Sequence, residues 1–383
     1  MSTSVATLRL AIVRQRYNPF GGAERFIERA LDALRNQGVA VTVITRRWTG
    51  PAASGPVRVC DPFYVGSLWR DASFGRAACA LATGGEFDLV QSHERLACCD
   101  VFRAGDGVHR EWLRQRARVQ GPLARLATRL NPYHRHVLRA ERTMFGSPRL
   151  KAVICNSDMV RDEIRRNFPI DAGKLHVIYN AVDTTQFHPG LRAEHRMAVK
   201  ARLGIPAEAP VLLFVGSGFQ RKGLATVLDA MAAASPDTHL IVVGKDKRLA
   251  AYRAHAVASG LGARCHFEGG QQDVRPYYGA ADLLLLPALY EPFANVTLEA
   301  LAAGVPVLTS RTNGGAELVE RSGGGHAHDA LDASAFAASI GMLLEPDRHA
   351  AASAAAVVAV RDLTPERMAQ AFVDLYAGLR RSR

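Results

Sequence analysis

The sequence has few of the features that mark secreted, metal-binding or membrane-spanning proteins. Its 383 residues include six cysteines, with no CxxC pair and no cysteine–histidine spacing that suits zinc. No apolar run approaches the roughly 20 residues of a transmembrane helix, and the N-terminus has neither the basic nor the apolar stretch of a signal peptide. These absences favour a reducing, cytoplasmic compartment, in which the adjacent Cys98 and Cys99 are expected to be small buried apolar residues.

Acidic charge is scarce in one segment above all. The net charge is +12, and residues 110–151 contain eleven basic residues against two glutamates, which gives 11 − 2 = +9. Large apolar side chains, among them Trp112 and Leu123, are interspersed with these arginines. The pattern favours an interfacial helix on an anionic membrane surface; nucleic acid is the competing partner, and a solvated helix covering its own domain is the plain alternative. We expect the membrane and no nucleic acid, with contacts from Arg114, Arg116, Arg118 and Arg125.

Strand and helix patterns alternate along almost the whole chain. Such alternation is typical of a parallel sheet covered by helices, and the length suggests two domains. The fold class predicted is α/β, with two Rossmann-like domains facing each other across a cleft. Buried strands are expected at Leu8–Val13, Val39–Thr45, Phe87–Ser92, Lys151–Asn156, Pro210–Gly216, His239–Val243 and Cys265–Glu268.

The domain boundary is predicted near residue 190. Residues 1–190 would form the first domain and residues 191–363 the second. Residues 184–210 have the proline and charge content of a linker with one short helix, and residues 364–383 are predicted to form a helix that packs back on the first domain.

Two glutamates, Glu291 and Glu299, flank a turn between a buried strand and a helix. The strand is expected within 280–287, and the helix is closed by Gly304 before another strand begins. Ligands of open α/β sheets bind at this edge, where a helix N-terminus offers N–H groups to hydroxyls or phosphate. Each carboxylate can accept hydrogen bonds from a pair of sugar hydroxyls. Two solvated acids are the alternative, which the strand–loop–helix context disfavours.

A second loop of the same half, at 214–223, carries adjacent cations just before a helix. Arg221 and Lys222 are suited to charge-assisted hydrogen bonds with a diphosphate, and Gly218 lets the backbone approach a ligand. The loop is not a GxxxxGK[ST] phosphate loop, so ATP hydrolysis is not indicated.

The first half offers three further candidates at strand ends. Gly21 and Gly22 precede a predicted helix, and the absence of GxGxxG there disfavours a nicotinamide cofactor. Asp106 stands between two glycines, where it is either an acid–base group or an ordinary turn aspartate. His93 and Glu94 follow another strand and are weaker candidates for the same site.

Taken together, these motifs resemble the retaining glycosyltransferases of family 4. The resemblance rests on Glu291 and Glu299, the 218–223 run Gly-Phe-Gln-Arg-Lys-Gly, the Gly21-Gly22 loop and the 179–187 turn, and it covers nearly the whole chain. It implies the GT-B fold, with a nucleotide-sugar bound in the cleft. A closer likeness is to the lipopolysaccharide core glucosyltransferases of the glucosyltransferase I type, which transfer glucose from UDP-glucose to an inner-core heptose.

The resemblance also assigns roles to individual residues. Glu291 would hold donor-sugar hydroxyls with help from the amides of Phe293, Ala294 and Asn295, and Glu299 would bind the ribose. Arg221 and Lys222 would neutralise the leaving diphosphate, and Gly22 would let phosphates and acceptor approach. Asp106 would take the acceptor-side catalytic position, where many members carry a histidine. A departure from the core enzymes is the Pro-Phe-Ala-Asn run at 292–295, where they tend to have small residues.

The same resemblance bounds partners and location. It implies no metal and no cofactor, because cations and helix dipoles stabilise the leaving group. The first domain would bind a lipid-linked oligosaccharide acceptor and the second the nucleotide-sugar, on the inner face of the cytoplasmic membrane. The alternatives are a family 4 enzyme with another nucleotide-sugar and another acceptor (capsule, O-antigen or glycolipid), a nucleotide-sugar 2-epimerase, and a non-catalytic membrane-docking protein.

Overall fold

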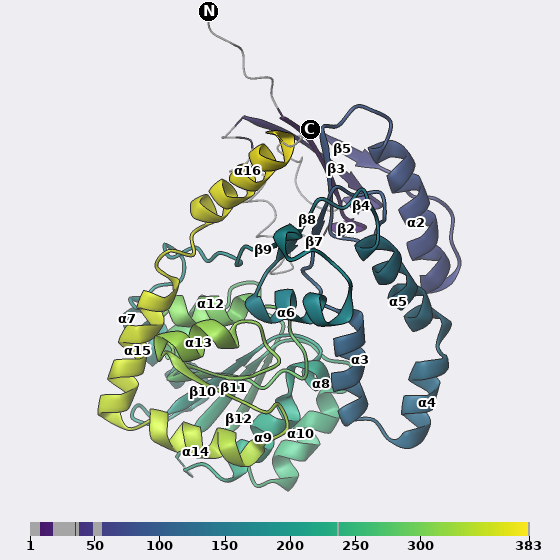
Figure 1. Cartoon of the computed structure of the whole chain (residues 1–383). Coiled ribbons are helices and arrows are strands. Elements are labelled where there is room, and N and C mark those ends of the chain that lie inside the picture. The colour runs from purple at the N-terminus through teal and green to yellow at the C-terminus, as the bar shows by residue number, and fades with distance from the viewer. Residues whose placement is uncertain (1–7, 18–34, 36–37, 49–55, 236, 382–383) are drawn as a thin grey trace, which may run out of the picture. The chain divides into compact units, whose positions relative to one another are not determined.

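The computed structural model describes residues 8–17, 35, 38–48, 56–235 and 237–381, which fall into two compact units (Figure 1). Unit 1 is formed by Met1–Asn180 and Pro365–Arg383, and unit 2 by Ala181–Thr364. The chain therefore passes between the units twice. The first division falls at residue 180 and not at the predicted 190.

Unit 1 is built on a seven-stranded sheet in which neighbouring strands pair in parallel. The order is β5-β3-β1-β6-β7-β8-β9, so successive strands are added first on one side of β1 and then, from β6 onward, on the other. The strands are β1 (Leu8–Val13), β3 (Val39–Thr45), β5 (Val57–Val59), β6 (Leu89–Ser92), β7 (Val101–Arg103), β8 (Ala152–Cys155) and β9 (Leu175–Val177), with a separate pair β2 (Arg16–Tyr17) and β4 (Arg47–Trp48).

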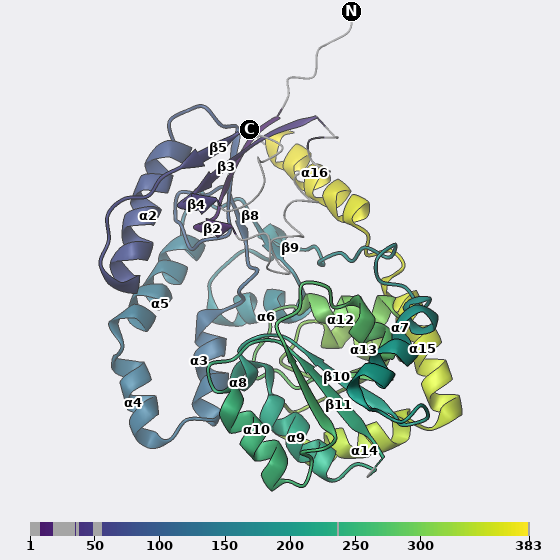
Figure 2. The same cartoon turned by 180° about the vertical axis from the view of Figure 1, so that it is seen from behind.

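The helices of unit 1 pack on this sheet and on one another. In both Figures 1 and 2, α2 and α5 lie side by side, and α4 extends from the end of α5. The described helices are α2 (Gly66–Ala82), α3 (His109–Arg118), α4 (Pro122–Leu130), α5 (Pro132–Phe145), α6 (Asp158–Asn167), the short 3-10 turn at Ala172–Lys174, and α16 (Pro365–Arg381).

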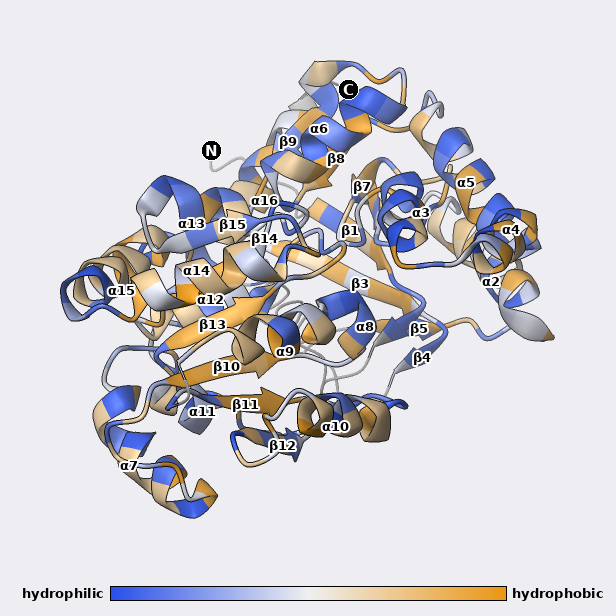
Figure 3. Cartoon of the chain, turned by 90° about the horizontal axis from the view of Figure 1, so that it is seen from below, coloured by the Kyte–Doolittle hydropathy of each residue, from blue (hydrophilic) through white to orange (hydrophobic). Residues whose placement is uncertain are grey.

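Unit 2 repeats the same architecture with a six-stranded parallel sheet. Its order, β12-β11-β10-β13-β14-β15, again reverses beside the first strand of the unit, between β10 and β13. The central strands are wholly buried and, apart from His239 at the start of β11, apolar (Figure 3), as expected of a sheet covered on both faces. The strands are β10 (Val211–Val215), β11 (His239–Val243), β12 (Cys265–Gly269), β13 (Leu283–Leu286), β14 (Val307–Ser310) and β15 (Gly325–His328).

The predicted linker at 184–210 is largely an integral part of unit 2. It contains α7, which packs on α11 so closely that a Cβ at Gly279 would lie 2.2 Å from the Leu191 carbonyl oxygen. Arg192 and Arg196 of α7 both pair with the buried Asp282 that precedes β13. The helices of unit 2 are α7 (Leu191–Leu203), α8 (Phe219–Lys222), α9 (Leu224–Ala232), α10 (Leu249–Ala258), α11 (Arg275–Ala280), α12 (Asn295–Ala302), α13 (Ala316–Ser322), α14 (Ala333–Leu343) and α15 (Pro346–Val360).

The C-terminal helix α16 belongs to unit 1. Its buried Tyr376 donates a 2.5 Å hydrogen bond to the Gln91 side chain at the end of β6. Phe372 lies under the guanidinium of Arg103, which is 5.8 Å from the ring centre. Burial first of all, and then the charge of Arg14, lower the pKa of Arg103 to about 9.

One expectation about the cysteines is wrong. Cys98 forms a disulfide with Cys79 of α2, whereas Cys99 is a buried free thiol. Spacing along the chain does not reveal this pairing, because it depends on α2 lying against the loop before β7. No helix in the described ranges is long and apolar enough to cross a membrane.

Candidate functional site

The loops after β10 and β13 meet at the carboxyl edge of the unit 2 sheet. These strands are neighbours, and the strand order reverses between them. Such a switch point leaves a crevice in which open α/β sheets bind ligands. The short helix α8 that follows β10 carries Arg221 and Lys222, and the loop after β13 carries Glu291. The topology therefore brings the two motifs of the second half together.

Glycines make this meeting of loops possible. Gly223 has φ +83°, and a Cβ on it would lie 1.9 Å from the Pro287 carbonyl oxygen. Any side chain there would push the two loops apart. Gly218 also has positive φ, but a Cβ added to it would meet no atom within 4 Å, so there the backbone conformation, and not crowding, favours glycine.

Arg221, Lys222 and Glu291 form one ion cluster. The Lys222 ammonium donates to Glu291 Oε2 at 2.5 Å, and the Arg221 guanidinium donates to the same oxygen. Burial opposes ionisation of Glu291, but the two cations outweigh it, so the pKa of this carboxyl lies below its ordinary value. Burial lowers the pKa of Lys222, and Glu291 opposes that shift. Two cations share one carboxylate, which leaves the cluster with a net positive charge.

The backbone around Glu291 is held by the loop that follows β14. The Glu291 amide donates to the Thr312 carbonyl at 2.9 Å, and its carbonyl accepts from Gly314 at 2.9 Å. Buried Asn313 connects four groups: its amide oxygen accepts from Ala294 and Gly315, and its NH₂ donates to the hydroxyls of Thr297 and Thr309. Sequence reasoning missed Asn313, although the Asn-Gly-Gly turn after a buried strand was a visible signal.

The helix α12 begins directly beside Glu291. Its first residue is Asn295, and Phe293 and Ala294 before it are buried. The predicted ribose ligand Glu299 lies one turn further along and accepts a 2.8 Å hydrogen bond from Tyr278 of α11. Burial, and then the Glu299 carboxylate, raise the pKa of Tyr278 well above its ordinary value. Tyr278 is thus a second residue that sequence reasoning missed, and no motif around it points to this contact.

In unit 1 the predicted Asp106 lies in the turn after β7, with its side chain 80 % exposed. Its carboxylate is 3.9 Å from Arg95, which also pairs with the buried Glu141 at 2.9 Å. Asp106 therefore stands at the carboxyl edge of the sheet, open to a ligand.

His93 and Glu94 follow β6 at the switch point of unit 1, beside the end of β1. Glu94 accepts from the Gln15 amide at 2.9 Å, and burial raises its pKa. Burial and the charges of Arg14 and Arg103 hold the pKa of His93 well below its ordinary value. Gly21 and Gly22, predicted to lie at the same edge, fall outside the described residues.

The basic segment forms three helices, α3, α4 and α5, and not a single interfacial one. Its arginines have local partners: Arg114 pairs with Glu111 at 3.0 Å, Arg116 lies 3.3 Å from His134, and Arg118 and Arg125 donate to Gln115 and the Ala117 carbonyl. No residue of α4 is buried, and Leu123 is 84 % and Leu130 62 % exposed.

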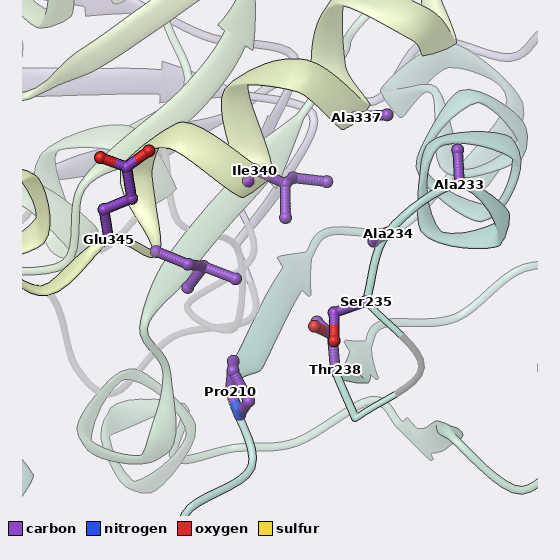
Figure 4. A pocket seen from close by; sticks show the side chains of 10 residues that line it. Pro210, Ala233, Ala234, Ser235, Thr238, Ala337, Ile340 and Glu345 are labelled. Carbon is purple, nitrogen blue, oxygen red and sulfur yellow. The ribbon is translucent and has the colours of Figure 1, made fainter.

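A pocket of unit 2 lies away from the ion cluster. It has a volume of about 320 Å³ and opens beside Pro210 and Thr238, which precede β10 and β11, at the opposite edge of the sheet (Figure 4). Its lining is mainly alanine, isoleucine, leucine and glycine, and it contains none of the predicted site residues. Within the described part of the chain, no group of three or more His, Cys, Asp or Glu is placed to hold a metal ion.

Comparison with known proteins agrees with this architecture. Residues 20–186 match the family model Glycosyltransferase Family 4, and residues 196–356 match the model Glycosyl transferases group 1. The chain therefore carries a glycosyltransferase family 4 domain and a glycosyltransferase group 1 domain. The predicted GT-B fold and glycosyltransferase class are confirmed.

The relatives extend over most of the chain. The lipopolysaccharide glucosyltransferase WaaG of Escherichia coli K12 is 28 % identical over 81 % of this chain and 82 % of its own length. LpsE of Rhizobium meliloti, a lipopolysaccharide core biosynthesis glycosyltransferase, is 27 % identical over 84 % of each chain. A crystal structure of WaaG superposes with a TM-score of 0.80 at 25 % identity, covering 96 % of this chain and 99 % of that one. Anabaena HepE, solved with UDP-glucose, shares the fold at 21 % identity, a TM-score of 0.72 and coverage of 97 % and 100 %.

Proposed function

We propose that this glycosyltransferase moves glucose from UDP-glucose to a heptose of the lipopolysaccharide inner core, with retention of the anomeric configuration. The observation that carries the proposal is the cluster of Arg221, Lys222 and Glu291 at the switch point of unit 2. Similarity to WaaG and LpsE, both named for lipopolysaccharide, supports the choice of acceptor.

The cluster is suited to a sugar joined to a diphosphate. Arg221 and Lys222 would turn their hydrogen bonds toward the diphosphate oxygens, which carry more charge than a single carboxylate. Glu291 would then accept hydrogen bonds from sugar hydroxyls, and the N-terminus of α12 would lie beside the anion. Glu299, held by Tyr278, would accept the ribose hydroxyls. The nucleotide-sugar is a substrate, and we propose that neither cofactor nor metal is required, because the two cations stabilise the leaving group.

The reaction is a single exchange of bonds at the anomeric carbon. The acceptor hydroxyl attacks C1 from the face that UDP leaves, so the C1–O bond to the β-phosphate breaks as the new glycosidic bond forms. The hydroxyl proton passes to a β-phosphate oxygen, whose developing charge Lys222 and Arg221 stabilise. Asp106 is the proposed acceptor-side residue, because it is exposed at the carboxyl edge of the unit 1 sheet.

A panel of nucleotide-sugars tests the donor. Thermal unfolding would be followed with UDP, UDP-glucose, UDP-galactose, UDP-N-acetylglucosamine, GDP-mannose, ADP-glucose and a CMP-sugar, and each stabilising compound assayed for transfer and hydrolysis. Selective stabilisation by UDP and UDP-glucose is expected. Selective stabilisation by a GDP- or ADP-sugar would leave the proposed type of reaction in place but show that the donor is not UDP-glucose. Conversion of UDP-N-acetylglucosamine without acceptor would instead reveal a 2-epimerase.

We further propose that the enzyme works in the cytoplasm as a peripheral protein on the inner face of the membrane, where a lipid-linked acceptor lies. The excess of basic residues in 110–151 supports this location, since each basic residue near an anionic surface contributes about 1 kcal/mol. Binding to vesicles containing phosphatidylglycerol should weaken as salt rises. Replacing Arg114, Arg116, Arg118 and Arg125 with glutamine should weaken it further, and an unchanged affinity would argue against the proposal.

A further inference from the structure

Exposed apolar side chains of the described residues are concentrated in two segments of unit 1. The first segment, residues 59–69, is the loop from β5 into the first turn of α2, and the second is α4. Of the thirteen large apolar side chains that are exposed among the described residues, eight lie in these segments, whereas unit 2 has four, which are separated in sequence. The eight are Val59, Phe63, Val65, Leu68, Trp69, Leu123, Leu126 and Leu130. Concentrated exposure of this kind marks an interaction surface.

The 59–69 loop presents an aromatic pair to solvent. Phe63 is 75 % and Trp69 43 % exposed, and their rings meet edge to face with centroids 5.5 Å apart. Val65, between them in sequence, is exposed as well. Aromatic side chains normally cover apolar area when the chain permits it, so a fold that keeps these two outside calls for a structural reason.

That reason is Arg46, a fully buried arginine directly after β3. Its guanidinium donates to the Pro62 carbonyl at 2.8 Å, the Arg70 carbonyl at 2.9 Å and the Ser73 hydroxyl at 3.2 Å, and it also pairs with Asp61. These contacts fasten the loop on both sides of the aromatic pair. The Tyr64 ring lies over the guanidinium, 4.6 Å from centroid to Cζ, which turns Tyr64 inward between its exposed neighbours. The aromatic pair is thus presented by a rigid support.

The two segments lie in the same region of unit 1. α2 packs against α5, and α4 packs against the N-terminal end of α5, as both cartoon views show (Figures 1 and 2). Asp71, in the first turns of α2, acts electrostatically on Tyr133 at the start of α5. Asn131, which joins α4 to α5, lies two residues before Tyr133. The apolar side chains of the loop and of α4 therefore flank one junction of helices.

We propose that the 59–69 loop inserts Phe63 and Trp69 into an anionic lipid bilayer, as a second anchor beside α4. The inference rests on the membrane docking proposed above and deepens it: the arginines attract the surface, and the loop enters the acyl boundary. Charge complementarity selects lipid as the occupant, because no acidic residue occurs between Glu111 and Glu141 while the apolar side chains of α4 alternate with arginines. A tryptophan and a phenylalanine on a fixed loop suit the interfacial depth of a membrane.

The test separates attraction from insertion by salt. Full-length protein would be sedimented with vesicles of equal parts phosphatidylglycerol and phosphatidylcholine, in low salt and in about 0.5 M NaCl, where charges are screened within a few ångströms. In low salt, the double variant Phe63→Gln, Trp69→Gln should bind nearly as well as the wild type. In high salt, it should bind at least about tenfold more weakly than the wild type does at the same salt concentration. The control is Met197→Gln, Val257→Gln, at two positions of unit 2 that are 61 % and 67 % exposed, and it should bind as wild type does.

A second readout locates the loop directly. Lipids brominated on the acyl chain should quench the fluorescence of the wild type, and Trp69→Phe should lose most of that quenching while Trp48 and Trp112 remain. If the wild type binds vesicles in a salt-sensitive way but neither Phe63→Gln, Trp69→Gln nor Trp69→Phe differs from it, insertion is wrong and electrostatic docking stands. If the wild type binds no vesicles, both electrostatic docking and loop insertion are wrong, whereas the proposed transfer reaction is not affected. A wild-type dimer that Phe63→Gln, Trp69→Gln makes monomeric would overturn the proposal in favour of a second copy of the chain.

Discussion

In the proposed reaction, Lys222 is the side chain on which transition-state stabilisation depends most directly. Its ammonium is almost buried and contacts Glu291 at 2.5 Å, and we propose that it stabilises the charge that develops on the departing diphosphate. We expect Lys222→Ala to lower kcat by about 10²- to 10³-fold, the usual effect of removing one preorganised donor. Steady-state kinetics measures this, with the exposed Arg321→Ala on α13 as the control that should keep full activity. A Lys222→Ala enzyme of normal kcat would remove the residue from the mechanism.

Tyr278 offers a test of the ribose contact. Its hydroxyl donates to Glu299 at 2.8 Å, and Tyr278→Phe would leave that carboxylate without this donor. We expect the donor KM to rise several-fold at nearly constant kcat, with a loss of about 1 kcal/mol in the free energy of unfolding. The neighbouring Tyr277→Phe is a matched control, because the Tyr277 hydroxyl bonds instead to Glu268 at 2.9 Å. Equal changes in KM for the two variants would contradict the role of Glu299.

At this scale the charged residues of the site were predictable from the sequence, but their supports were not. Arg221, Lys222 and Glu291 stood out because cations and carboxylates at strand ends have few structural uses. Asn313 and Tyr278 are of residue types that are common in ordinary turns and cores. Their importance comes from contacts with Ala294, Thr297 and Glu299, which only the folded chain makes.

The helices α3 and α5 are joined by a relay of neutral histidines. Arg116 donates to His134 Nε2, so His134 donates from Nδ1 to His109 Nε2 at 3.1 Å, and His109 can accept only while it is uncharged. Burial, and then the charges around it, lower the pKa of His109 to about 4.

This relay predicts acid sensitivity of unit 1. Because the folded-state pKa of His109 lies below the ordinary histidine value of 6.5, the unfolded chain binds the proton more readily, and stability present above pH 6.5 is lost as the pH falls toward 4. His109→Gln keeps an acceptor that does not titrate, so its free energy of unfolding should fall less steeply across that window. Denaturant unfolding at a series of pH values measures both slopes, and identical slopes would refute the relay.

Among the elements, regular strands were predictable and irregular pairings were not. Val39–Thr45 and His239–Val243 form the strands that their apolar patterns indicate. The basic segment misled because charge and apolar content predict an interfacial character but not the breaks, which Pro122 and Pro132 place at the first turns of α4 and α5. Nor does local pattern show that α7 packs on α11, because that contact spans a large sequence separation.

For the whole molecule, the return of α16 to unit 1 is the feature with the clearest consequence. The chain leaves unit 1 at residue 180 and returns at residue 365. The last helix therefore packs on a sheet whose strands all lie within the first 180 residues. Truncation after Thr364 removes Tyr376 from Gln91 and Phe372 from Arg103. We expect unit 1 to lose several kcal/mol, the size typical of an uncovered core, while unit 2 keeps its own core.

Hydrogen exchange resolves the two units in one experiment. In the truncated chain, amides of β6 and β7 should exchange much faster than in the full chain, whereas those of β10 and β13 should be unchanged. Unaltered protection of β6 and β7 would mean that α16 is not needed by unit 1.

The two-unit architecture followed from the alternation of patterns and from chain length, but the unit boundary did not. Linker-like composition extends from 184 to 210, while contacts divide the chain at residue 180. Composition reports solvation of the surface, and the division depends on which sheet a segment packs against.

The most direct test of the proposed function is to follow glucose from donor to product. Full-length enzyme would be incubated with UDP-[¹⁴C]glucose and inner-core lipopolysaccharide that ends in heptose, and the anomeric configuration of the product determined by NMR. We expect one glucose per acceptor in α linkage, the configuration of the donor, with transfer by Lys222→Ala reduced as stated above. A β linkage, or no transfer to heptose from UDP-glucose under conditions in which the enzyme is folded, would contradict the proposed function.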